Sequence, residues 1–146
     1  MHIALGCDHR GLTVKRAIME ALSRMQHSCR DFGCHSGESV DYPDIARQVA
    51  EAVAAGRFEQ GILVCGTGIG MSIAANKVKG IRAALCYDAF AARRSRQHND
   101  ANILCLKGEN MEIGLVLEIV EAYLSSVFEG DRHIARLRKI EAMEGK

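Results

Sequence analysis

Short apolar runs alternate with longer amphipathic stretches along this whole chain, and the alternation strongly constrains its fold. A parallel strand can rejoin its sheet only through a crossover connection, so regular alternation is typical of a parallel sheet with helices on both faces. The runs at 61–65 and 81–86 are apolar enough to be buried on both faces. The pattern predicts a Rossmann-like three-layer α/β/α sandwich with a five-stranded parallel sheet.

The predicted strands cover residues 2–6, 29–32, 61–65, 81–86 and 102–106. The predicted helices cover residues 12–25, 42–55, 69–77, 89–97, 111–128 and 131–144, and Asp131 is the expected N-cap of the last one. No internal repeat or low-complexity segment divides the chain. We therefore expect 1–146 to form one domain, with 129–146 as a C-terminal helical extension.

Charge and cysteine content narrow the functional classes. The 19 basic and 18 acidic residues nearly cancel, which argues against a general nucleic-acid or membrane-surface binder. The six cysteines include no Cys-x-x-Cys pair, so we expect reduced thiols and no metal site. No stretch has the length and apolarity of a membrane span, and we expect a soluble, cytoplasmic protein.

A cysteine followed by a glycine-rich turn is the leading candidate for chemistry. Residues 65–72 read Cys-Gly-Thr-Gly-Ile-Gly-Met-Ser and lead from an apolar run into a predicted helix. Glycines let backbone N–H groups approach an anion, and the same environment favours the thiolate of a nearby cysteine. A tight turn without a ligand would also explain the glycines, and Cys65 could be a small buried apolar residue.

Two further segments carry candidate residues. Asp8 and His9 follow the first predicted strand, and the carboxyl ends of parallel strands share one edge, so we expect them near Cys65 and Tyr87. Asp8 could equally cap the next helix. His98 closes a predicted helix, where it either favours the helix C-terminus or supplies a group that titrates near neutrality.

Arg132 and Arg136 are four residues apart on a predicted helix, so they share a face. Solvated surface arginines are one explanation. Two converging guanidiniums would also form a bidentate phosphate clamp.

Taken together, six ordered segments closely resemble ribose-5-phosphate isomerase type B. They are Gly-Cys-Asp-His-x-Gly at 6–11, Val-Asp-Tyr-Pro-Asp at 40–44, the glycine-loop stretch at 65–77, Gly-Ile-Arg-Ala at 80–83, the stretch at 95–102, and Glu-Gly-x-Arg-His at 129–133. The resemblance runs from Ile3 to about Ile140. It implies interconversion of an aldose phosphate and a ketose phosphate without a cofactor or metal.

The resemblance assigns the proton transfers to four residues. Cys65 is the implied base that moves a proton between C1 and C2 through an enediolate, and Thr67 assists at the developing oxygens. His98 is implied to open the sugar ring. Asp8 is implied to hydrogen-bond the sugar near the ring oxygen.

The resemblance also implies binding roles and a shared site. The enediolate would be held by Asn99 and by the backbone amides of Gly66, Gly68, Ile69 and Gly70. The phosphate would be held by His9, Arg132 and Arg136. In the family, His98 and Asn99 come from the partner of the chain that provides Cys65, which implies a homodimer or tetramer, with 129–146 contacting the partner.

Two positions bear on the base and the substrate. Some members use a glutamate six residues after the cysteine position, where this chain has Met71, so Cys65 remains as the base.

The family usually has Leu-Gly-x-Arg after the last strand, whereas residues 106–111 read Leu-Lys-Gly-Glu-Asn-Met. Lys107 is the candidate replacement, as a point charge without a forked geometry. Ribose 5-phosphate is the expected substrate, with allose 6-phosphate, galactose 6-phosphate or a tetrose phosphate as alternatives.

Two other classes of function stay open from the residues. A nicotinamide-dependent oxidoreductase would use the glycine loop together with Asp88, but the Gly-x-Gly-x-Gly spacing departs from the dinucleotide fingerprint. A non-catalytic phosphosugar-binding subunit would account for the altered loop at 107–111.

Overall fold

The computed structural model describes residues 1–145 and contains one five-stranded sheet. Its strands are β1 (His2–Cys7), β2 (Ser28–Asp31), β3 (Gln60–Cys65), β4 (Ala83–Leu85) and β5 (Ile103–Lys107). The order across the sheet is β2-β1-β3-β5-β4, and every neighbouring pair is parallel. The predicted fold class is confirmed.

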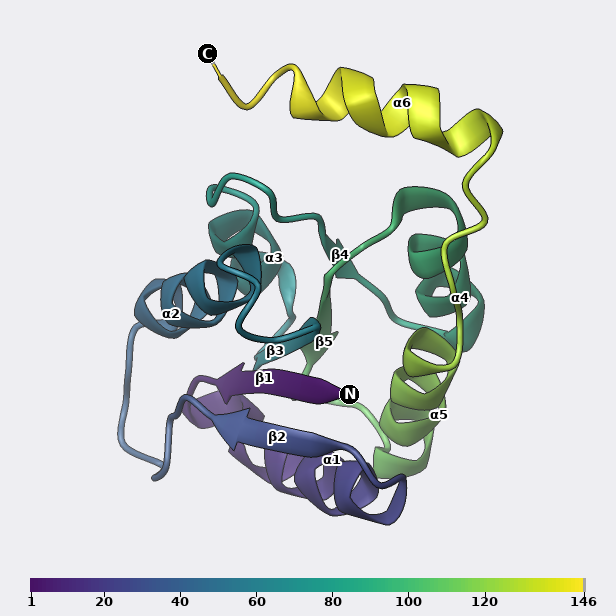
Figure 1. The fold of residues 1–146 in the computed structure, drawn as a ribbon. Helices are drawn as coiled ribbons and strands as arrows, with labels where there is room; N and C mark the ends of the chain where they lie inside the picture. The colour runs from purple at the N-terminus through teal and green to yellow at the C-terminus, as the bar shows by residue number, and fades with distance from the viewer. Residues whose placement is uncertain (146) are drawn as a thin grey trace.

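Helices cover both faces of this sheet (Figure 1). They are α1 (Leu12–Arg24), α2 (Tyr42–Ala54), α3 (Ile69–Ala75), α4 (Ala89–Asn99), α5 (Ile113–Leu124) and α6 (Arg132–Glu141), and a short 3-10 turn spans His9–Gly11. One face packs against α1 and α5, with α4 against α5, and the other face packs against α2 and α3. The last helix, α6, lies beyond this sandwich.

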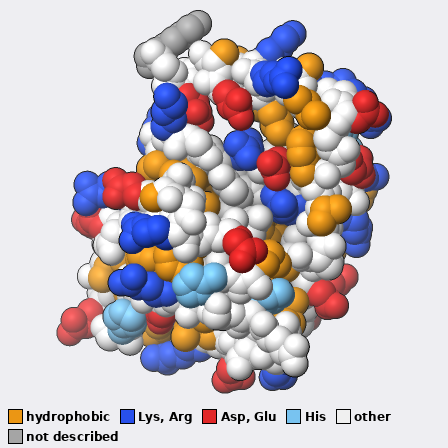
Figure 2. Space-filling view, in the orientation of Figure 1, with side chains coloured by type: hydrophobic (Ala, Val, Ile, Leu, Met, Phe, Trp, Pro, Cys, Tyr) orange, Lys and Arg blue, Asp and Glu red, His pale blue; other side chains and the backbone are white. Residues whose placement is uncertain are grey.

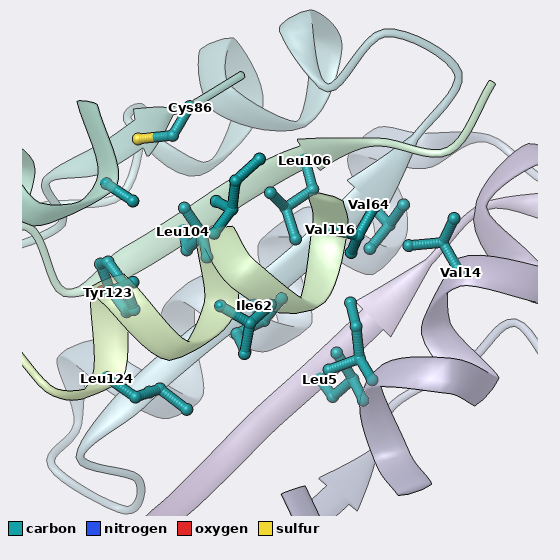
Figure 3. Packing of buried hydrophobic residues seen from close by; sticks show 14 of the residues in the cluster. Leu5, Val14, Ile62, Val64, Cys86, Leu104, Leu106, Val116, Tyr123 and Leu124 are labelled. Atoms are coloured by element: carbon teal, nitrogen blue, oxygen red, sulfur yellow. The ribbon is translucent and has the colours of Figure 1, made fainter. Parts of the chain in front are cut away.

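Strand β3 lies at the centre of the sheet, and its side chains alternate between the two cores. Ile62 and Val64 join the cluster under α1 and α5 (Figure 3), whereas Leu63 and Cys65 join the cluster under α2 and α3. All six residues of β3 are buried. Because both faces are covered, the strand holds the following turn in a fixed place.

Strand β4 is shorter and less buried than the sequence predicts. It lies at the edge of the sheet, pairs only with β5, and its three residues are half-buried. The expectation of a strand buried on both faces is wrong because Ile81 and Cys86 are buried from the flanking loops. Helix α3 stops early because Asn76 hydrogen-bonds both the N–H and the C=O of Ala83, at 2.8 and 2.9 Å.

The strand order reverses between β1 and β3. The chain leaves β1 through α1 to reach β2 on one side, and α2 then returns it to β3 on the other side of β1. In open parallel sheets, the crevice outside such a reversal is where ligands bind. Asp8 and Cys65, which end or follow these two strands, are therefore brought to one crevice, and the Asp8 N–H donates to Val64 O at 3.1 Å.

All six cysteines are free. Burial raises the pKa of Cys7 to about 12 against the lowering effect of Lys15, and burial raises the pKa of Cys86 to about 11. Burial also raises the pKa of Cys105, which is fully buried. Among residues 1–145, no helix combines the length and apolarity needed to cross a membrane.

The raised thiol pKa values predict a loss of stability at alkaline pH. Between pH 9 and about 12 the unfolded chain releases thiol protons that the folded chain retains, so stability falls as pH rises. Each such thiol contributes a slope of about 1.4 kcal/mol per pH unit. Urea unfolding under reducing conditions should therefore show a shallower decline for Cys105→Ala than for the wild type. Equal slopes would contradict this reading.

Candidate active site

A cleft of about 840 Å³ opens at the crevice between β1 and β3. Its walls come from residues 8–10 after β1, 39–44 at the start of α2, and 65–73 around the glycine turn. Cleft volumes of this size suit small-molecule ligands. The predicted site residues that line it are Asp8, His9, Cys65, Gly66, Thr67, Ile69 and Gly70.

Cys65 lines this cleft and is only 4% exposed. The Gly68 N–H donates to its sulfur at 3.2 Å. Gly68 adopts a φ of +79°, and a Cβ there would lie 2.9 Å from the Leu106 backbone, so only glycine fits. The turn therefore holds a backbone hydrogen-bond donor against the Cys65 sulfur.

Backbone contacts anchor this turn from outside. The Gly108 N–H donates to Cys65 O at 2.7 Å, and the Glu109 N–H donates to Gly66 O at 3.2 Å. Tyr87 donates its hydroxyl to Thr67 O at 2.7 Å, as expected for residues that share one edge of the sheet. The loop after β5 therefore holds the glycine turn in place.

Asp8 both caps a turn and lines the cleft. Its Oδ1 accepts hydrogen bonds from the N–H groups of Arg10 and Gly11, at 2.9 and 3.2 Å, so it caps the short 3-10 turn. Both bonds fall on one oxygen, and the residue also lines the cleft. Its second oxygen is thus available to a ligand.

His9 is oriented by the backbone of the opposite wall. The Val40 N–H donates to its Nδ1 at 3.3 Å, which assigns the proton of the neutral ring to Nε2. An Nε2–H next to the cleft can donate to a phosphate or hydroxyl oxygen.

Five predicted site residues do not line this cleft: Gly68 belongs to the glycine turn, and the other four lie on α4 and α6. His98 and Asn99 end α4, and Arg132 and Arg136 lie on α6. Within one chain, the proposed base and the proposed ring-opening histidine therefore belong to separate groups of residues.

His98 stacks on the buried His133, which belongs to the motif at 129–133 but was given no role from the sequence. The rings of His98 and His133 lie 4.2 Å apart at an interplanar angle of 16°, and both Nε2 atoms lie 3.8 Å from Glu129 Oε2. Burial lowers the pKa of His133, with His98, Arg132 and Arg136 lowering it further. A ligating ring nitrogen holds its metal ion close to the ring plane, so near-parallel stacked rings are poorly arranged to bind one ion together.

Four further residues bear on the choice of base, on the missing loop arginine and on the walls of the cleft. Met71 is fully buried in the core beneath α2 and α3, away from any proton-transfer role. Lys107 places its Nζ over the Tyr87 ring, 5.1 Å from the centroid. Tyr42 and Arg10 also line the cleft, although neither of them was given a role from the sequence. For Tyr42, the motif at 40–44 could have indicated one.

Comparison with known proteins identifies the family of this chain. Residues 3–140 match the model of the Ribose/Galactose Isomerase family. Ribose-5-phosphate isomerase B of Escherichia coli is 46% identical over 142 residues, covering 97% of this chain and 95% of that protein. D-erythrulose-4-phosphate isomerase of Pectobacterium atrosepticum is 39% identical over 141 residues, covering 96% and 93%.

A solved structure of ribose-5-phosphate isomerase B from Clostridium thermocellum superposes with a TM-score of 0.98 at 50% identity, covering 99% of this chain and 98% of that one. The chain therefore belongs to the ribose/galactose isomerase family, a class of intramolecular oxidoreductases that act on sugar phosphates.

The Gly68 geometry yields a prediction. Gly68→Ala should lower the free energy of unfolding by about 1–3 kcal/mol, since it forces a side chain into a left-handed conformation against backbone. Isomerase kcat should fall about a hundredfold as the N–H leaves the sulfur. Gly37→Ala, in open space, is the matched control. Wild-type activity in Gly68→Ala would refute the role of this donor.

Proposed function

We propose that this protein interconverts ribose 5-phosphate and ribulose 5-phosphate, with Cys65 as the base. The observation that carries the proposal is the Gly68 N–H held 3.2 Å from the Cys65 sulfur, inside a cleft that Asp8 and His9 also line. A cysteine in that setting is equipped to act as a thiolate base.

The proposed reaction moves one proton along the carbon chain. The Cys65 thiolate removes the proton from C2 of the open-chain aldose, and the C1 carbonyl becomes part of an enediolate. The resulting thiol returns the proton to C1, while the Thr67 hydroxyl passes the oxygen-bound proton from O2 to O1. Backbone N–H groups of residues 66–70, apart from that of Gly68, which donates to the Cys65 sulfur, stabilise the enediolate, each by about 2.7–4 kcal/mol by analogy with oxyanion holes.

Ring opening precedes this step and needs a second acid–base group. We assign it to His98 of a partner subunit, with Asp8 bound near the ring oxygen and Asn99 at the enediolate. Arg132 and Arg136, also from the partner, hold the phosphate with His9. The separation of these residues from the cleft within one chain supports a site shared between two subunits.

Exposed apolar side chains support the same assembly. Figure 2 shows hydrophobic side chains gathered along α6, flanked by basic ones. Ile134 and Ile140 of α6 are 40% and 43% exposed, and Ile73 of α3, which lines the cleft, is 59% exposed. Apolar surface at the cleft and on residues 129–145 is suited to burial in a homodimer, the minimum unit of the proposed site.

The substrate assignment follows the names of similar proteins, since ribose-5-phosphate isomerase B is the name of relatives at 39–50% identity and D-erythrulose-4-phosphate isomerase that of one at 39%. Family membership argues against a nicotinamide-dependent oxidoreductase, and the presence of both Cys65 and His98 argues against a non-catalytic subunit. Six free cysteines, including the proposed base, fit a reducing cytoplasmic compartment.

Removing the proposed base tests the reaction. In deuterated water, Cys65→Ala should lose exchange of the C2 proton of ribose 5-phosphate by at least about a hundredfold, while phosphosugar binding persists. Cys29→Ala, a half-buried cysteine on β2, is the matched control. Undiminished exchange in Cys65→Ala would refute the assignment.

Mixing two inactive variants tests the shared site. Cys65→Ala and His98→Ala should each be inactive, and their mixture, after dissociation and random reassociation, should recover about a quarter of wild-type activity. Half of the dimers would be mixed, and each would hold one intact site. If both residues of a site came from one chain, the mixture would remain inactive.

A further inference from the structure

The cleft has a charge balance that a phosphate ligand must overcome. Three carboxylates line it, from Asp8, Asp41 and Asp44. Among its lining residues, all within the described part of the chain, Arg10 is the only lysine or arginine. A phosphate dianion entering this half of the site would meet one permanent cation.

Backbone packing places Arg10 over the catalytic turn. A Cβ on Gly66 would lie 3.2 Å from Arg10 Cδ and 3.3 Å from Glu109 Oε2. A Cβ on Gly108 would lie 2.6 Å from Arg10 O, so the loop after β5 runs directly against the Arg10 backbone. Arg10 is therefore held beside Gly66 by its main chain, while its guanidinium remains free to reorient.

Glu109 is the present partner of that guanidinium. Arg10 Nη1 lies 3.6 Å from Glu109 Oε1, and the two side chains are 58% and 48% exposed. A single exposed ion pair at this distance contributes little, so exchange of the carboxylate for a dianionic phosphate is favourable. Lys107, the other cation of the loop, lies over the Tyr87 ring instead.

We propose that Arg10 contacts the substrate phosphate and that Glu109 is a positioning residue that keeps the guanidinium over the Cys65–Gly66 turn until the substrate binds. This inference rests on the proposed function, because it names a further phosphate contact of the same site. Arg10 donates N–H groups to the phosphate oxygens, and the released Glu109 carboxylate turns to solvent. Arg10, rather than Lys107, thereby replaces the loop arginine that this chain lacks.

Steady-state kinetics with ribose 5-phosphate test the proposal. Arg10→Ala should raise KM about tenfold with kcat within about twofold, because a contact to the non-reacting phosphate binds ground and transition states alike. Arg10→Lys should recover part of the loss, since it keeps the charge without the fork. Arg24→Ala, exposed at the far end of α1, is the matched control, and Lys107→Ala should also leave KM unchanged.

Inorganic phosphate binding, measured by calorimetry, separates this proposal from the proposed function because it needs no turnover. The dissociation constant should rise about tenfold in Arg10→Ala and fall two- to threefold in Glu109→Gln, where the competing carboxylate is gone. Unchanged phosphate binding and KM in Arg10→Ala, or a KM rise confined to Lys107→Ala, would overturn the Arg10 contact. If the wild type binds phosphate through Arg10 but turns over no sugar phosphate, the contact stands and the proposed function fails.

Discussion

The hydrogen bond from the Gly68 N–H to the Cys65 sulfur depends on much of the fold, and the proposed chemistry depends on it in turn. Strand β3, covered on both faces, delivers Cys65 to the crevice in a fixed position. The left-handed backbone of Gly68 then turns an N–H back toward the sulfur. Helix α3 has only seven residues, so nearby amides rather than a long helix dipole supply the favourable field.

The same topology supports the proposed division of the site between two subunits. The reversal between β1 and β3 gathers the base, the Asp8 carboxylate and His9 in one cleft, whereas α4 and α6 carry the remaining candidates elsewhere. Each half has its own support: backbone donors hold the Cys65 turn, and the buried His133 packs against the ring of His98. Assembly of two chains would thus bring together two preorganised halves.

Much of this architecture was predictable because it depends on local sequence patterns. Alternating apolar runs predict the strands and their parallel pairing, and the glycine spacing predicts a turn that presents Cys65. The sequence overestimates the length and burial of strand β4, because Ile81 and Cys86 are buried although they lie in the loops that flank it. Composition cannot distinguish such buried loop residues from strand residues.

Long-range contacts account for what the sequence did not reveal. No local pattern links Arg10 with Glu109 or His98 with His133, because these pairs meet only when separate connections fold onto one another. Tyr42 forms a cleft wall for the same reason: it packs where a Cβ on Gly70 would lie, only 2.5 Å from its ring. Such contacts depend on tertiary packing rather than on residue spacing.

The most direct test is a crystal structure with a linear phosphosugar hydroxamate, whose planar oxygens mimic an enediolate. We expect the hydroxamate within about 3.5 Å of the Cys65 sulfur, with its oxygens about 2.7–3.1 Å from the amides of residues 66–70. His98 of a second subunit should complete the site. A hydroxamate bound away from Cys65, or a site closed by His98 of the same chain, would contradict this mechanism.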